Sequence, residues 1–128
     1  MPLLPADSYS RAVEYEIDEV NNSIKQIWQY GKERGSELFS PFIGTAEYLS
    51  NRNKLICFGG ISRDLSGKPE LPWDIAKNIR QKTKNLSHVV EVTGDKNPEV
   101  VFELMIKDRD KDSYIGYECY KAVKISLY

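Results

Sequence analysis

The last part of the chain, residues 88–128, alternates apolar and polar positions more regularly than the rest. Alternation with a period of two is typical of antiparallel strands that are buried on one side. We therefore predict three strands here, at residues 88–93, 100–107 and 114–128, joined by two short turns. In the last strand the odd positions are mostly apolar, so Ile125 is expected to face the core.

Two earlier stretches have features of amphipathic helices. Residues 10–34 carry apolar residues at spacings of four, three, four and three, which places them on one stripe of a helix: Val13, Ile17, Val20, Ile24 and Ile27. Residues 72–86 start with a proline, which is common in the first turn of a helix, and we predict a second helix there. The stripe of the first helix either packs on the domain's own sheet, the favoured interpretation, or forms a dimer seam.

The remaining pattern completes the predicted fold. Residues 54–58 form a short apolar run between turn residues, which predicts a buried central strand. Residues 36–50 fit either a bent strand or a short helix, because Pro41 and Gly44 interrupt both periods. The predicted fold class is α+β, with residues 1–128 as a single domain. It is a two-layer sandwich, in which two helices pack on one face of an antiparallel sheet with a C-terminal three-strand meander.

Length and composition suggest where the protein is located and whether its cysteines are reduced. With 128 residues the chain has the length of one domain. It contains no run of about 20 apolar residues, as a membrane span requires, and its first residues lack the regions of a signal peptide. These features predict a cytoplasmic protein. Cys57 and Cys119 fall in predicted strands and are interpreted as buried thiols rather than a disulfide.

Charge is distributed unevenly along the chain. The net charge is −4 over residues 1–47, +5 over residues 48–86 and −2 over residues 87–128. A basic block can neutralise phosphates, so nucleic-acid binding is one alternative function, through Arg52, Lys77, Arg80, Lys82 and Lys84. The overall isoelectric point of about 5.9 argues against a dedicated nucleic-acid binder.

The loop between the predicted central strand and the second helix is the best candidate for a small ligand. A glycine pair followed by a loop into a helix N-terminus can present backbone N–H groups to an anion. The residues predicted to form this anion-binding site are Gly59, Gly60, Arg63, Lys68 and Trp73. Their spacing matches neither a phosphate-binding loop nor a dinucleotide fingerprint, and a plain surface connection is the competing interpretation.

Few residues suggest catalysis. His88 is the only histidine, which excludes a metal site built on several histidines. It could pair with Cys57 or Cys119, but both thiols are expected in the core, where they are usually inert. Glu103 and Lys107 do not have the spacing of a nuclease motif. We therefore predict no catalytic residue, metal or cofactor, and leave enzyme activity open while leaning against it.

Three tyrosines provide the candidate for an interaction surface. Tyr114, Tyr120 and Tyr128 occupy even positions of the last predicted strand, opposite its apolar face. Aromatic residues on an open sheet face suit a protein interface, and an edge strand invites pairing with another chain. The sequence thus predicts a small, non-catalytic binding or regulatory protein that acts through a protein partner or self-association.

Overall fold

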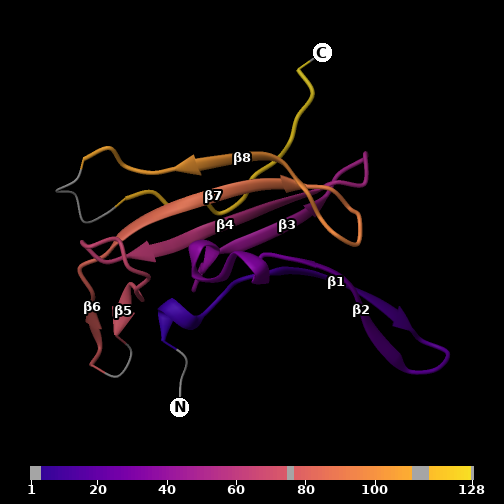
Figure 1. The fold of residues 1–128 in the computed structure, drawn as a ribbon, viewed down its shortest axis with the longest axis horizontal. Helices are drawn as coiled ribbons and strands as arrows, with labels where there is room; N and C mark the ends of the chain where they lie inside the picture. Colours follow the sequence, from indigo (N-terminus) through magenta and orange to yellow (C-terminus); the bar gives the residue numbers. More distant parts are fainter. Residues whose placement is uncertain (1–3, 75–76, 111–115, 128) are drawn as a thin grey trace.

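Four antiparallel strands form the centre of the structure, a computed structural model that describes residues 4–74, 77–110 and 116–127 (Figure 1). They lie in the order β3-β4-β7-β8. Their bounds are Gly44–Tyr48 for β3, Lys54–Arg63 for β4, Lys84–Val92 for β7 and Val100–Ile106 for β8. The strands predicted at residues 54–58, 88–93 and 100–107 are confirmed, and the first two are longer than predicted.

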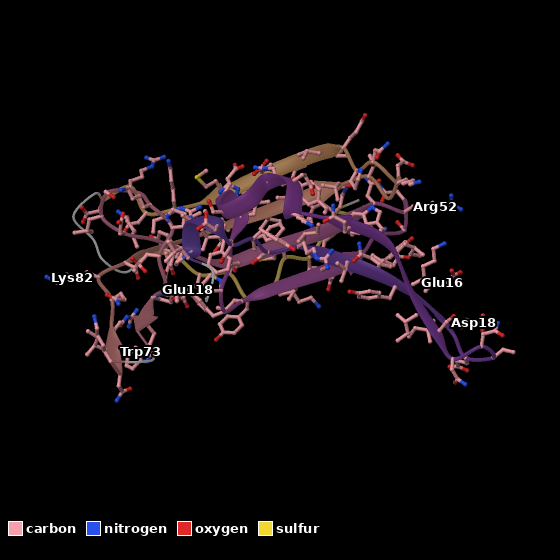
Figure 2. The ribbon with its side chains drawn as sticks, turned by 60° about the horizontal axis from the view of Figure 1, so that its bottom comes forward. Glu16, Asp18, Arg52, Trp73, Lys82 and Glu118 are labelled. Atoms are coloured by element: carbon pink, nitrogen blue, oxygen red, sulfur yellow. The ribbon has the colours of Figure 1, made fainter. Side chains whose placement is uncertain are left out.

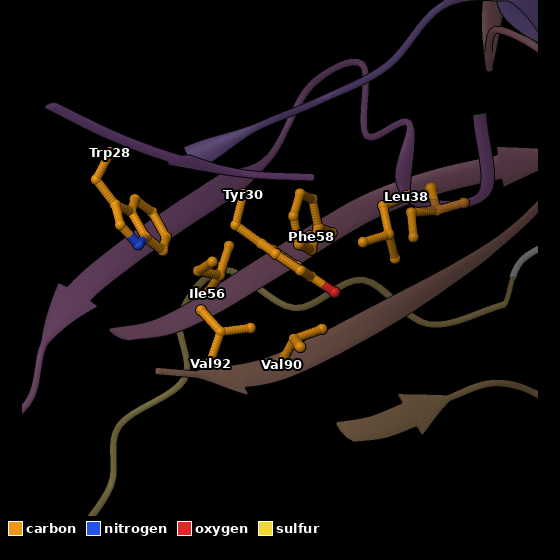
Figure 3. Packing of buried hydrophobic residues seen from close by; sticks show 8 residues of the cluster. Trp28, Tyr30, Leu38, Ile56, Phe58, Val90 and Val92 are labelled. Atoms are coloured by element: carbon orange, nitrogen blue, oxygen red, sulfur yellow. The ribbon is translucent and has the colours of Figure 1, made fainter. Parts of the chain in front are cut away.

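The two central strands are buried along most of their length because both faces of the sheet are covered. Ile56 and Phe58 of β4 pack with Val90 and Val92 of β7, beneath Trp28 and other residues of the N-terminal third (Figure 3). On the opposite face, buried residues of the same strands form a smaller cluster, Leu55, Cys57 and Val89. A strand with both faces covered shows a continuous apolar run rather than alternation.

A β-bulge interrupts β4 at Gly59 and Gly60. The pairing moves from Phe58 opposite His88 to Ile61 opposite Leu86, so β4 contains one residue more than β7 over this interval. This extra residue turns the side chains that follow it to the opposite face of the strand, so that two residues three positions apart point to the same side of the sheet. As a result Ile61, which is fully buried, joins the same core cluster as Phe58.

The predicted helix at residues 10–34 is wrong: this stretch forms a hairpin of β1 (Ala12–Asp18) and β2 (Ser23–Tyr30). The hairpin projects from the four-stranded sheet (Figure 1). Its turn is stabilised by Asp18, whose carboxylate accepts hydrogen bonds from the backbone N–H groups of Val20 and Asn21. Asn22 follows with a φ of 50°, a left-handed conformation that Asn tolerates. The β-branched residues of the stripe favour a strand over a helix.

The second predicted helix, at residues 72–86, is also wrong. Trp73–Asp74 (β5) pairs with Ile79–Arg80 (β6) in a small hairpin, and β7 begins at Lys84. Among the described residues, the only helical segments are two 3-10 turns, η1 (Pro5–Asp7) and η2 (Lys32–Leu38). The predicted α+β sandwich with two helices is therefore incorrect, and the described part of the chain is mostly β. Within the ambiguous stretch 36–50, the structure has the end of η2 and then β3.

Residues 116–127, here called the C-terminal segment, contain no strand, although the sequence predicted one at 114–128. Residues 114, 115 and 128 lie outside the described residues. The segment crosses the sheet on the side of the smaller cluster, where the N–H groups of Tyr117 and Cys119 donate to the carbonyl oxygens of Asn85 and Gly59. Ile125, predicted to face the core, is 70% exposed.

A buried lysine connects the projecting hairpin to the sheet. Lys54 begins β4, and its ammonium group lies 2.9 Å from the Glu14 carboxylate of β1. The same group lies 4.2 Å from the ring centre of Trp28 and 4.6 Å from that of Tyr48. Because an ammonium group can be buried only when it is paired, this arrangement fixes the base of the hairpin against β3 and β4.

Within the described part of the chain, no helix has the length and apolar character needed to cross a membrane. This finding does not bear on the compartment, so the cytoplasmic location predicted from the sequence stays a prediction.

Candidate functional site

A cavity of about 340 Å³ opens beside the edge strand β3. Its walls are residues 10–12 before and at the start of β1, residues 40–43 after η2, and the facing parts of β3 and β4. The floor is formed by Ile56 and Phe58, which pair with Ala46 and Gly44 of β3. Because glycine has no side chain and alanine only a methyl group, β3 leaves the space above this floor open.

One serine hydroxyl fixes the wall of this cavity to the β4 bulge. Ser40 Oγ donates to the carbonyl oxygen of Ile43 and accepts a 2.8 Å hydrogen bond from the N–H of Gly60. The N–H of Gly59 donates to the same Ile43 oxygen over 3.1 Å. Ser10 completes the wall, since its hydroxyl donates to the carbonyl oxygen of Ser40 and accepts from the Ser40 N–H. The polar wall is therefore held in one arrangement by its own hydrogen bonds.

Arg11 and Phe42 provide the two groups of the cavity that suit a ligand. Arg11 is exposed and donates from Nη1 to the neutral side chain of Gln26 over 3.0 Å. It forms no ion pair among the residues that the structure describes, so its charge is not neutralised by the protein there. Phe42 is 43% exposed, and its ring lies over Gly60. The cavity thus combines one cation with one aromatic surface.

A network of charged side chains holds the segment that precedes the cavity wall. Arg34 of η2 makes paired hydrogen bonds to two carboxylates, that of Glu37 over 2.6 and 2.8 Å and that of Glu103 over 2.9 and 3.2 Å. It also donates to the hydroxyl of Tyr30 over 2.8 Å. Glu103 lies 2.7 Å from Nδ1 of His88. Paired Arg–carboxylate contacts of this kind are strong and directional, so η2 is tied to β7 and β8.

The network predicts acid sensitivity. Hydrogen bonds from Arg34 hold the pKa values of Glu37 and Glu103 below the ordinary 4.5. Because both carboxyl groups bind protons less readily when folded, their stabilisation is present above about pH 4.5 and is lost as the pH falls through the lowered pKa values. Arg34→Gln is expected to lower the free energy of unfolding at pH 7 and to flatten its decline in acid. Urea unfolding between roughly pH 7 and pH 3.5 measures both effects; an unchanged acid slope in the variant would contradict the assignment.

The five residues of the predicted anion loop do not lead into a helix N-terminus, because the loop runs into the strand β5 (Trp73–Asp74). The N–H groups of Gly59 and Gly60 are already bonded to Ile43 and Ser40. Those of Ser66 and Lys68 donate to the Asp64 carboxylate within the turn. Arg63 donates to the carbonyl oxygens of Ser36 and Glu37, and Trp73 lies in β5. Anion binding by this set stays a prediction, and the arrangement does not favour it.

The predicted basic face is divided between two ends of the molecule. Figure 2 shows Arg52 at the opposite end from Lys82 and Trp73. Lys77, Arg80 and Lys82 lie in or beside the β5–β6 hairpin and are exposed, and the Lys84 ammonium donates to the carbonyl oxygen of Asp110. Nucleic-acid binding stays untested, but Arg52 does not belong to the same surface as the others.

The structure does not form the predicted tyrosine row with Tyr120, and it does not bring Cys57 and His88 together. Tyr120 is 77% exposed in a segment without strand structure, and Tyr114 and Tyr128 lie outside the described residues. Tyr120 is therefore not part of a tyrosine row on the face of a strand. Binding of a protein partner or of a second copy stays a prediction. Cys57 and His88 face opposite sides of the sheet, because Cys57 belongs to the smaller cluster whereas His88 contacts Glu103 on the side of Arg34.

Sequence reasoning missed the cavity residues because none of them belongs to a recognisable motif. Ser10, Arg11 and Ser40 are separated along the chain and converge only through the hairpin and β3. A signal that could have indicated them is Pro41, which interrupts regular structure beside two serine-containing stretches. Within residues 4–74, 77–110 and 116–127, no group of three or more His, Cys, Asp or Glu side chains is arranged to hold a metal ion.

Comparison with known proteins identifies relatives. Residues 2–118 match the arylsulfotransferase (ASST) family. The arylsulfate sulfotransferase AssT of Escherichia coli O6:H1 (strain CFT073) is 36% identical over 106 residues, which cover 82% of this chain and 17% of that protein. The arylsulfate sulfotransferase AssT of Lelliottia amnigena has the same identity and coverage. The chain therefore spans about a sixth of the length of these curated relatives.

These matches contradict the function predicted from the sequence. A non-catalytic regulatory protein acting through protein–protein interaction was inferred mainly from the lack of a familiar catalytic motif. That inference fails because the matched relatives are named as sulfotransferases, and the lack of a familiar motif is not evidence against catalysis. The cavity beside β3, rather than the tyrosines, becomes the first candidate for function.

Proposed function

Because this chain belongs to the arylsulfotransferase family, we propose that the cavity beside β3 binds the sulfate ester of an aryl sulfate during transfer of its sulfo group. The observation that supports this most directly is that Arg11 and Phe42 both line this cavity. An aryl sulfate carries an anionic tetrahedral group on a flat apolar ring. A cation beside an aromatic surface complements both parts.

The hydrogen bonds of the wall single out Arg11 as the anion-binding group. The hydroxyl hydrogens of Ser10 and Ser40 are directed at backbone carbonyl oxygens, so they are not available to sulfate oxygens without rearrangement. The guanidinium of Arg11 has several N–H donors, and among the described residues it donates only to Gln26. Arg11 can therefore turn two donors towards one sulfate group, as guanidinium groups do with other oxyanions.

The chain covers 17% of the length of its curated relatives, so we propose that it supplies one wall of a larger site. In this role it orients the aryl sulfate, while the ring of Phe42 and the floor of Ile56 and Phe58 hold the aromatic part. The transfer step itself belongs to the family's whole fold. The activity attributed to the chain alone is binding.

A titration of the chain with 4-nitrophenyl sulfate, followed by calorimetry, tests the proposal. Saturable binding is expected, with 4-nitrophenol binding more weakly because it lacks the sulfate. Arg11→Gln is expected to weaken the binding of 4-nitrophenyl sulfate about tenfold or more, since a charged hydrogen bond contributes about 1.5–3 kcal/mol. Arg80→Gln, an equal charge change outside the cavity, is the control. Absence of saturable binding, or equal effects of the two variants, would refute the proposal.

Filling the cavity provides a second test. Ala46→Leu adds a branched side chain above Ile56 at an exposed position of the edge strand β3, so the fold is expected to remain stable while 4-nitrophenyl sulfate binding is lost. Circular dichroism and thermal unfolding check the fold, and the same titration checks binding. Retained affinity in a folded Ala46→Leu variant would place the ligand elsewhere.

A further inference from the structure

The two cysteines of the chain come together on the face of the sheet that carries the smaller cluster. Cys57 is buried in β4, and Cys119 packs against the same cluster from the C-terminal segment. The Cys57 thiol donates to the carbonyl oxygen of Cys119 over 3.4 Å. Sixty-two positions separate the two residues in the sequence, so this contact is made by the fold and not by local chain geometry.

The backbone around Cys119 is positioned independently of the thiols. The Cys119 N–H donates to the carbonyl oxygen of Gly59 over 3.1 Å, and the Tyr117 N–H donates to that of Asn85 over 3.1 Å. Gly59 allows this approach, because an added Cβ would collide with the carbonyl group of Cys119. Two hydrogen bonds and a glycine thus hold Cys119 against β4 whether or not the sulfur atoms react.

We propose that Cys57 and Cys119 form a disulfide bond that fastens the C-terminal segment to the central strand. The co-reactant is a small-molecule or protein disulfide. The thiolate of one cysteine attacks the external disulfide, forms a mixed disulfide and releases one thiol. The second cysteine, as its thiolate, then attacks the protein sulfur and releases the other thiol. The two cysteines lose two electrons and two protons, and the external disulfide is reduced to two thiols.

The two cysteines differ in ways that set the order of these steps. Cys119 is only half-buried, whereas Cys57 is buried, so an external disulfide reaches Cys119 first. Burial and the neighbouring Cys119 thiol raise the pKa of Cys57 to about 12. Because the thiolate is the attacking form, closure by Cys57 is the slow step and is expected to speed up as the pH rises. This proposal does not depend on ligand binding at the cavity, which lies beside β3.

Thiol trapping tests the proposal directly. The reduced chain is incubated with oxidised glutathione, denatured in N-ethylmaleimide and weighed by mass spectrometry. The expected product is a monomer lighter than the reduced chain by two hydrogen atoms, with no maleimide added and with the peptides of Cys57 and Cys119 joined. Cys57→Ser is the matched control, expected to stop at a glutathione adduct on Cys119.

Two other results would overturn the proposal. If the wild-type chain takes up maleimide at both cysteines, they remain the independent buried thiols that the sequence analysis predicted. If it accumulates the Cys119–glutathione adduct or a disulfide-linked dimer, the two cysteines do not close on each other. A second measurement is thermal unfolding, where the oxidised chain is expected to melt several degrees higher than the reduced one and dithiothreitol to reverse the gain, because a bond closing a long loop restricts the unfolded state.

Discussion

Val90→Asp is expected to prevent the sheet from folding. Val90 is fully buried in β7, at the centre of the main core cluster with Ile56 and Phe58. A carboxylate there would lose its hydration without gaining a partner, in addition to the lost packing of two methyl groups. The cost is about 4 kcal/mol or more, a large part of the roughly 5–15 kcal/mol that stabilises a typical domain. Urea unfolding followed by circular dichroism measures it.

Ile125→Asp is the control for this substitution. It makes a similar chemical change at a residue that is 70% exposed, so the free energy of unfolding is expected to change by less than about 0.5 kcal/mol. If Ile125→Asp were as damaging as Val90→Asp, the C-terminal segment would be packed as the sequence pattern predicted. A fully stable Val90→Asp variant would mean that the core cluster is incorrectly placed.

Gly59→Val is expected to release the C-terminal segment from the sheet. The added Cβ would occupy the position of the Cys119 carbonyl group and press on Ile43. The Cys119 carbonyl is a backbone group and Ile43 belongs to the cavity wall, so moving either one aside costs free energy. We expect a loss of about 2–4 kcal/mol, together with faster proteolysis within residues 116–127. Intact-mass analysis after brief protease treatment measures the second effect.

Gly44→Ala is the matched control for Gly59→Val. Gly44 lies on the neighbouring strand, and an added Cβ there would meet only the carbonyl oxygen of Cys57, at an ordinary contact distance of 3.4 Å. This variant is expected to keep the C-terminal segment protected from protease. Equal proteolysis of the two variants would show that the segment responds to any change in the sheet rather than to the contact at Gly59.

The sequence predicted the strands whose burial is dictated by local composition. The apolar run at residues 54–58 is short and lies between turn residues, which favours a buried strand over a helix, and the turn residues at 94–98 leave the two strands on either side to pair. For that reason pattern alone located β4, β7 and β8.

The hairpin of β1 and β2 could not be predicted by counting apolar spacings. Val13 and Ile17 fit a helix stripe, but they fit a twisted hairpin equally well when an Asp-initiated turn separates the strands. Asn22 in a left-handed conformation and the Lys54–Glu14 ion pair, which involves a residue far along the chain, decide between the two. Short apolar patterns do not distinguish these cases, because tertiary contacts override local preference.

The cavity could not be predicted from the sequence for a related reason. Its floor depends on the register that places Gly44 and Ala46 opposite Phe58 and Ile56, and register is a property of the assembled sheet. The alternation in residues 114–128 was misleading because residues 116–127, the described part of this stretch, are held by side-chain and backbone contacts to β3, β4 and β7 instead of forming a strand. Lys124, for example, reaches the buried Glu91 carboxylate over 2.7 Å.

The way the C-terminal segment is held also fixes its place in the folding sequence. Each of its anchors joins residues far apart in the chain, with separations of 33 positions for Lys124 and Glu91 and 62 for Cys57 and Cys119. Closing such long loops is entropically costly until the partner surface exists. Because its backbone anchors are the carbonyl oxygens of Gly59 in β4 and Asn85 in β7, we expect the segment to dock after these two strands have paired. Its amide hydrogens are then expected to exchange with solvent sooner than those of the central strands.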